Sequence, residues 1–259
     1  MQTVVIAVVV LFSTATIAVA LGLLVASTQP FDRAFAQQNG AHVTATFSAK
    51  ATDDLAATSD LDEVEAAAGP FGIATENLKA ADAPDDIPGV SFTIVGRDRP
   101  VGGQVDAMDL WQGRWAAKPG EIVVKATPGM DQPARDIGAR LTDAHGRTFT
   151  VVGKAYSLSD TADAWVTPGQ MADLKPTETQ MLYRFHDHDT SADIAAGLKA
   201  VTDRLPEGSL VASQSYLVIK KTVSAGPGKY LPFLMVFGIL GVLVAVFVVV
   251  NVVSGAVVS

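Results

Sequence analysis

Residues 230–253 read YLPFLMVFGILGVLVAVFVVVNVV, and this stretch decides how the rest of the chain is interpreted. It contains no charged side chain, and neither do residues 254–259. As a helix, residues 231–253 would span about 34 Å, which exceeds a hydrocarbon core of about 30 Å. A buried helix of a globular domain would normally present a polar face, and this stretch has none. We therefore predict a transmembrane helix over residues 231–253.

A second uncharged stretch, residues 4–26, lies near the other end of the chain. One interpretation is a cleaved signal peptide, since Ala18-Val19-Ala20 and Ala34-Phe35-Ala36 resemble small-residue cleavage sites. However, the apolar run is longer than a usual signal core, and no Lys or Arg precedes it. These features favour an uncleaved transmembrane helix over residues 4–26.

All charged side chains lie between Asp32 and Lys229. The chain has 259 residues and a formal net charge of −8, so it lacks the basic surface that nucleic acid or anionic lipid would attract. No nucleic-acid partner is expected. Cysteine is absent, which excludes disulfides and thiolate metal sites. The roughly 200 residues between the two spans suffice for a proper hydrophobic core.

The middle of the chain, residues 27–229, alternates short strand patterns with a few helix patterns, which predicts an α+β domain. A charged turn is expected at residues 96–100, and a hairpin turn at residues 143–146. Strands are expected at residues 43–47, 91–95, 121–126, 140–142, 148–155 and 181–185.

Helices are expected where cap signals precede an apolar periodicity. The first, residues 61–68, would start after Ser59 or Asp60 and stop at Gly69-Pro70. The second would begin at Pro168, with Thr167 as the cap and the Gln170 side chain reaching back to it. Two more are expected, a short helical turn from Pro30 and a longer helix over residues 191–204.

The chain offers no catalytic constellation, so we predict a protein that is not an enzyme, without catalytic, cofactor-binding or metal residues. His186 and His188 could face the same way on an extended segment, but a third metal ligand is not evident. A solvated turn is the simpler interpretation. No serine lies in a nucleophile-elbow pattern. The remaining candidates are acidic residues, interpreted as a solvated face near a helix N-terminus: Asp60, Asp62, Glu63 and Glu65.

Several stretches resemble the FtsX-like, MacB-type permeases of ABC transporters, particularly their actinobacterial branch. The stretches keep the family's order, and their spacing extends over nearly the whole chain. They are residues 30–36 (PFDRAFA) with 40–42 (GAH), 113–115 (GRW), 119–123 (PGEIV), 149–153 (FTVVG), 164–168 (AWVTP), 213–217 (SQSYL) and 251–258 (NVVSGAVV).

The resemblance implies a MacB periplasmic-core-like α+β domain between two transmembrane helices in the plasma membrane. It further implies that a separate cytoplasmic ABC ATPase subunit hydrolyses ATP, and that the complete permease, a homodimer, carries the resulting motion to the extracytoplasmic domain. Substrate export or control of an outside partner would follow. No cofactor is implied for this chain itself.

The chain departs from this family pattern in several ways. Family members usually continue past the second span into a basic cytoplasmic segment that meets the ATPase, followed by further membrane helices. That segment is absent here, so we expect the N-terminal part of a longer permease. Basic residues before the first span are also missing. Residues 226–228 (GPG) are expected to break the helical connection into the second span.

Orientation is a separate question. The lysines at 220, 221 and 229 would suggest a cytoplasmic middle, but long loops cross the membrane largely regardless of charge. Following the family, we expect residues 27–229 outside the cytoplasm. The rival hypothesis is a stand-alone, membrane-tethered binding or sensor module.

Overall fold

The computed structural model describes residues 30–84, 86–100, 102, 104–126 and 133–228. The spans predicted at residues 4–26 and 231–253 lie outside these ranges. Within the described ranges, no helix combines the length and the apolar character needed to cross a bilayer. The chain forms two units, Ala34–Ile219 and a second unit in which residues 30–33 and 220–228 are described.

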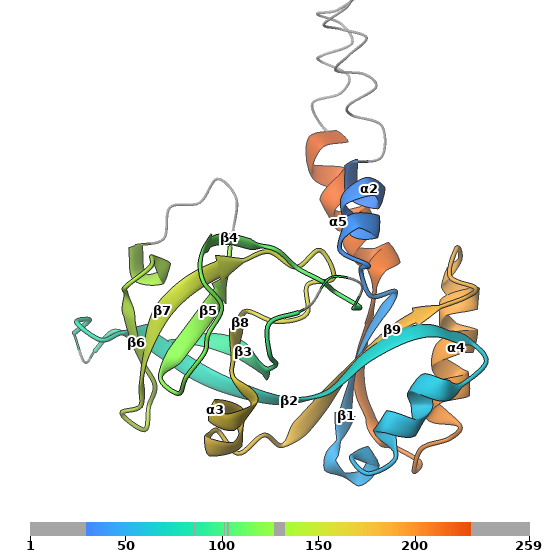
Figure 1. The fold of residues 1–259 in the computed structure, drawn as a ribbon, viewed down its shortest axis with the longest axis horizontal. Helices are drawn as coiled ribbons and strands as arrows, with labels where there is room; N and C mark the ends of the chain where they lie inside the picture. Colours follow the sequence, from blue (N-terminus) through green and yellow to red (C-terminus); the bar gives the residue numbers. More distant parts are fainter. Residues whose placement is uncertain (1–29, 85, 101, 103, 127–132, 229–259) are drawn as a thin grey trace, which may run out of the picture. The chain divides into compact units, whose positions relative to one another are not determined.

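The fold is α+β, as predicted, and a ten-stranded mixed sheet is its main feature (Figure 1). Its strands are β1 (Val43–Ser48), β2 (Val64–Ala80), β3 (Val90–Gly96), β4 (Leu110–Gly113), β5 (Glu121–Lys125), β6 (Arg140–Thr142), β7 (Thr148–Ala155), β8 (Ala164–Val166), β9 (Glu178–Phe185) and β10 (Leu210–Ser215). The α-helices are α2 (Pro30–Gln37), α3 (Pro168–Asp173), α4 (Ser191–Thr202) and α5 (Tyr216–Gly228). Three short 3-10 helices are η1 (Ala49–Ala51), η2 (Leu55–Asp60) and η3 (Pro133–Arg135).

One part of the sheet closes into a ring, which we call the barrel. Its strands follow the order β2-β3-β8-β5-β7, and β6 completes the ring because it pairs with both β7 and β2. Adjacent residues of the central strands face different apolar clusters: Ile94 contacts one and Val95 the other. The same alternation holds for Val123 and Val124. Strands covered on both faces read as continuous apolar runs, which is how β5 and β8 read in the sequence.

The other part of the sheet, which we call the flat sheet, contains β10, β1, β9 and β2 in that order, all antiparallel. Strand β2 belongs to both parts. Its first half pairs with β9, and its second half pairs with β3 from Ile73 onward. In Figure 1, β2 runs continuously from one part to the other. A single 17-residue strand therefore joins the barrel to the flat sheet.

The predicted helix at residues 61–68 is wrong. Residues 64–80 form β2, and the Gly69–Pro70 pair, expected as a helix stop, lies within it with a cis peptide bond. Here pairing with β9 overrides the helix preference of an alanine-rich segment, because Ala66, Ala67 and Ala68 gain cross-strand partners that an isolated helix would lack. The four acidic residues near this segment are exposed, as expected of a solvated face, but they do not begin an α-helix.

Most other elements are confirmed with small shifts of their ends. The hairpin turn between β6 and β7 contains Gly146 at φ +79°, a backbone angle that glycine adopts without steric cost. Thr167 caps α3 by accepting from the Gln170 backbone N–H. The Gln170 side chain, however, accepts instead from the Gly120 N–H at 2.7 Å, so its predicted return to the cap is wrong. Helix α5 continues through residues 226–228, where a break was predicted.

Helix α4 contacts the Phe185 ring of β9 at Gly197, a residue without a side chain. A Cβ placed at Gly197 would lie 2.7 to 2.9 Å from three ring atoms of Phe185. Real Cβ atoms do not approach that closely, so the helix and the ring are in contact only because position 197 is glycine. Ile194 and Val201 are buried on the same helix, as predicted from its periodicity.

We expect Gly197→Ala to destabilise the protein by about 1–3 kcal/mol, although alanine normally favours a helix interior over glycine. The matched control is Gly169→Ala in α3, where an added Cβ meets no atom within 4 Å and the effect should stay within about 0.5 kcal/mol. Urea unfolding of the full chain in detergent, followed by tryptophan fluorescence, measures both, since Trp111, Trp115 and Trp165 lie in one unit. A Gly197→Ala variant as stable as the parent would contradict this packing.

Candidate functional site

The most unusual group in the described structure is the carboxylate of Asp106, which is fully buried at 0% exposure. Asp106 sits at φ +56°, a left-handed angle that Asp and Asn tolerate better than most residues. The Arg97 guanidinium, 2% exposed, donates to Oδ2 of Asp106 at 3.2 Å. Ser157 donates to Oδ1 at 2.8 Å, and Thr161 donates to Oδ2 at 3.0 Å. The buried charge is therefore both paired and hydrogen-bonded, as burial of a charge requires.

Arg97 follows β3 directly and is held on several sides. Its second guanidinium nitrogen donates to the Val105 carbonyl at 3.4 Å, and the Phe71 ring lies 4.8 Å from its central carbon. Its own backbone N–H donates to the Val166 carbonyl at 3.0 Å. The charged turn predicted at residues 96–100 therefore contains an arginine that faces inward, whereas Asp98 and Arg99 are exposed as a turn would suggest.

The same network connects the segment before β1 to the barrel. The Asp106 and Ala107 N–H groups donate to carbonyls of Asn39 and Gln38 at 2.9 and 2.7 Å. The Gln38 side chain accepts from the Leu158 N–H at 3.1 Å. The Ala41 N–H donates to the Ser159 hydroxyl at 2.8 Å. Residues 38–41 are thus fixed by groups that surround Asp106.

Burial raises the pKa of Asp106, while the neighbouring Arg97 charge and the Ser157, Thr161 and Ser159 hydroxyls lower it. Burial likewise lowers the pKa of Arg97, and its Asp106 partner opposes this. Each charged group compensates for the desolvation of the other. Loss of either partner would leave an uncompensated charge in the interior, which is far more costly than loss of a surface ion pair.

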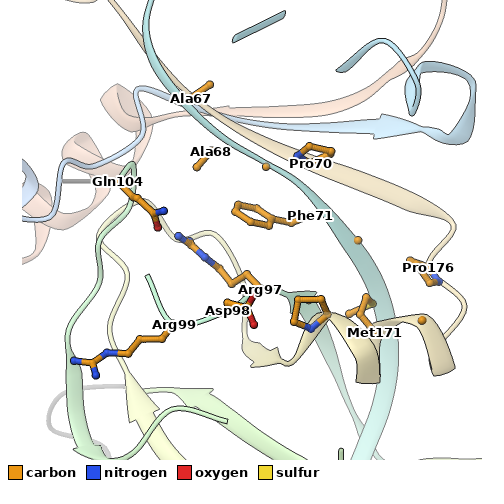
Figure 2. A pocket seen from close by; sticks show the side chains of 15 residues that line it. Ala67, Ala68, Pro70, Phe71, Arg97, Asp98, Arg99, Gln104, Met171 and Pro176 are labelled. Atoms are coloured by element: carbon orange, nitrogen blue, oxygen red, sulfur yellow. The ribbon is translucent and has the colours of Figure 1, made fainter. Parts of the chain in front are cut away.

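Two cavities lie at opposite ends of this network. The first has a volume of about 700 Å³ and is shown in Figure 2, where the Arg97 side chain lies between Phe71 and Gln104 while Arg99 extends away. Most of its remaining lining is apolar, including Met171 of α3. Helix α3 can approach the sheet here because a Cβ at Gly96 would lie 2.4 Å from the Met171 side chain.

The second cavity, of about 400 Å³, is lined largely by polar side chains. Thr161 belongs both to its lining and to the Asp106 network. Gln180 of β9, another lining residue, donates through its side-chain amide to the Thr161 carbonyl at 2.8 Å. A buried chain of hydrogen bonds therefore runs from Arg97 in the first cavity to Gln180 in the second.

The histidines singled out in the sequence lie elsewhere. His186 is exposed, and the His188 ring stacks on the buried His42 ring with centroids 3.8 Å apart. The His42 Nδ1 accepts from the Phe185 N–H at 3.0 Å. Burial, together with the nearby charges of His188 and Arg184, lowers the pKa of His42 to about 3. Neither His186 nor His188 belongs to a cluster of metal-ligating side chains in the described ranges, and their lack of metal binding stays a prediction.

A cluster of ligand-type side chains does occur at the β6–β7 turn, where Glu76, Asp143 and His145 place one atom each within 4.8 Å of one another. Its centre is taken by Arg147, which contacts Asp143 at 2.5 Å and Glu76 at 2.6 Å. Burial would raise the pKa of Asp143, but hydrogen bonds from Arg147 and the His145 N–H hold it below its usual value. A metal ion would have to displace the guanidinium, so these residues form a structural ion pair.

Among the comparisons with known proteins, the comparison with solved structures alone found similar chains. No protein-family model matches the chain, and no curated protein matches it either. The periplasmic region of MacB from Actinobacillus actinomycetemcomitans is 12% identical with a TM-score of 0.42, covering 70% of this chain and 92% of the other.

The extracellular domain of the noncanonic ABC-type transporter YknZ from Gram-positive bacteria is 10% identical with a TM-score of 0.38. The match covers 67% of this chain and 98% of the other. A domain of a protein named as a putative permease, from Porphyromonas gingivalis, is 13% identical with a TM-score of 0.37, covering 68% of this chain and 88% of the other. At these values we draw no functional conclusion from the likeness.

The Asp106 network predicts a large effect for a small change. Asp106→Asn keeps the side-chain shape and tolerates the same φ, but it removes the charge that Arg97 needs, so we expect a loss of about 3–5 kcal/mol in the free energy of unfolding. Asp160→Asn is the matched control, because Asp160 has φ +52° and its side chain is 42% exposed. An exposed pair contributes about 0–1 kcal/mol. Similar urea midpoints for the two variants of the full chain would contradict the role given to Asp106.

Proposed function

We propose that this chain is a membrane permease subunit, or part of one, of an ABC transporter of the FtsX-like, MacB-type family. Residues 4–26 and 231–253 would cross the plasma membrane, and residues 27–229 would form its extracytoplasmic domain. A cytoplasmic ABC ATPase subunit would supply the driving motion, and the complete permease would work as a homodimer. The two uncharged stretches and the ordered sequence resemblance support this proposal.

The observation that carries the proposal is the proximity of the two ends of the folded region. Within the 34–219 unit, the Phe35 and Tyr216 rings stack with centroids 4.9 Å apart. Within the other unit, Asp32 and Lys220 form an ion pair at 2.7 Å. The chain thus enters and leaves the folded region at neighbouring points, next to the two uncharged stretches. This is the arrangement required of a domain inserted between two adjacent membrane helices.

The connection toward residues 231–253 is helical as far as it is described. Helix α5 includes residues 226–228, so the proline and glycines there do not end it. A continuous helix transmits a displacement along its axis better than a loop does, because its backbone hydrogen bonds resist local bending. This favours a mechanical role for the connection over that of a passive tether.

A stand-alone binding module is the second candidate, and the two cavities joined by the Asp106 network favour it. The resemblance implies that the ATPase contacts a cytoplasmic segment after the second span, so the test uses the protein expressed from its own gene, with any segment that follows residue 259 retained. Purification of this N-terminally tagged protein from membranes in mild detergent separates the two. A permease subunit should bring an ABC ATPase with it, at near one-to-one stoichiometry. Recovery of the chain without any ATPase would favour the binding module.

The extracytoplasmic position of residues 27–229 can be tested with one introduced thiol, because the chain has no cysteine. Ala144 is exposed in the β6–β7 turn, so Ala144→Cys should react with a membrane-impermeant maleimide in intact cells. Val151→Cys, at a fully buried position of β7, is the control and should react after denaturation alone. Labelling of Ala144→Cys that requires cell lysis would place the domain in the cytoplasm and overturn the proposed topology.

A further inference from the structure

The second cavity carries features that point to a ligand. One face of the sheet forms its floor, where the pairs Thr46–Gln180, Ile73–Glu178 and Thr75–Thr93 lie side by side on neighbouring strands. Residues 160–163, from the loop between β7 and β8, and Lys125 line it as well. Cross-strand partners point to the same face of a sheet, so these hydroxyl, amide and carboxylate groups all face the same space.

Gln180, which lines this cavity, carries a buried acceptor that has no hydrogen-bond partner among the described residues. Its side chain is 3% exposed, and its Nε2 is committed to the Thr161 carbonyl at 2.8 Å. That bond determines which end of the amide is the oxygen, and Oε1 has no hydrogen-bond partner among the described residues. A buried acceptor without a donor is unfavourable, so a ligand that supplies an N–H group there gains a strong hydrogen bond.

The charges around Gln180 specify which kind of donor fits. The lining includes three carboxylates, of Asp160, Asp163 and Glu178, against the single ammonium of Lys125, which pairs with Asp160. Asp163 uses Oδ2 to accept from the Thr93 N–H at 3.0 Å. Glu178 precedes Gln180 by two residues on β9 and therefore faces the same side. The cavity holds more acceptors than donors and a net negative charge.

We propose that the second cavity binds an organic cation that carries a primary ammonium group. The ammonium N–H groups would donate to Gln180 Oε1 and to the Glu178 and Asp163 carboxylates. Its volume of about 400 Å³ suits a small molecule or the end of a longer one. The three carboxylates do not form a ligand cluster within 4.8 Å in the described ranges, which disfavours a bare divalent ion. Among the described residues, the lining also includes no aromatic ring on which a neutral sugar could stack.

Spermidine is a suitable probe, titrated by calorimetry into the full chain in detergent at low ionic strength. We expect saturable one-to-one binding that weakens about 10-fold or more in Glu178→Gln, because a charge-assisted hydrogen bond is lost. Gln180→Met, which removes the amide at similar volume, should weaken binding to a comparable extent. Glu207→Gln is the control: it makes the same charge change at an exposed position outside the cavity and should leave the affinity unchanged.

Several outcomes would overturn the proposal. Absence of saturable spermidine binding is one, and equal weakening by Glu178→Gln and Glu207→Gln, which would indicate diffuse electrostatic attraction, is another. Binding of Ca²⁺ with no binding of spermidine would identify a metal site instead. If Gln180→Met does not fold, the comparison of spermidine affinity between Glu178→Gln and Glu207→Gln is sufficient to test the proposal. Since the measurement concerns binding to the isolated chain, its result is independent of the proposed permease function.

Discussion

The buried carboxylate of Asp106 is the constraint on which the arrangement of this domain depends. A charge with no access to water must be paired and hydrogen-bonded, and the groups that satisfy Asp106 come from separate parts of the chain. Arg97 follows a barrel strand, and Thr161 belongs to a loop that also holds Gln180 of the flat sheet. The two parts of the sheet are therefore connected twice, by strand β2 and by this network.

The network also explains why the two cavities are of different character. The Arg97 guanidinium pairs with Asp106. Arg97 and the Phe71 ring on which it stacks also line the first cavity, where most of the other lining residues are apolar. At the other end, the Thr161 hydroxyl donates to Asp106 and the Thr161 carbonyl accepts from the Gln180 side-chain amide. The Gln180 Oε1 has no donor among the described residues. The second cavity is also lined by the carboxylates of Asp160, Asp163 and Glu178, so acceptors outnumber donors there. A ligand with several N–H groups supplies what that cavity lacks.

Local signals in the sequence predicted local structure well. The cap at Thr167 and the glycine turn between β6 and β7 were predicted because a single short segment determines each of them. Residues 61–68 were predicted wrongly because their state depends on β9, more than a hundred residues later. The site was missed for the same reason. In the sequence, Arg97 appears as part of a charged turn. Nothing near position 180 indicates that the Gln180 side-chain amide donates to a loop carbonyl 19 residues earlier, at Thr161.

Through Arg97, Thr161 and Gln180, the Asp106 network connects the barrel to the flat sheet, so we expect the two parts to unfold as one cooperative unit. Native-state hydrogen exchange of the full chain, compared between the parent and Asp106→Asn by mass spectrometry, tests this most directly. We expect amides of β5 in the barrel and of β1 in the flat sheet to lose protection together, by the same free energy of opening. Loss of protection confined to one of these strands, or to the residues around position 106, would contradict it.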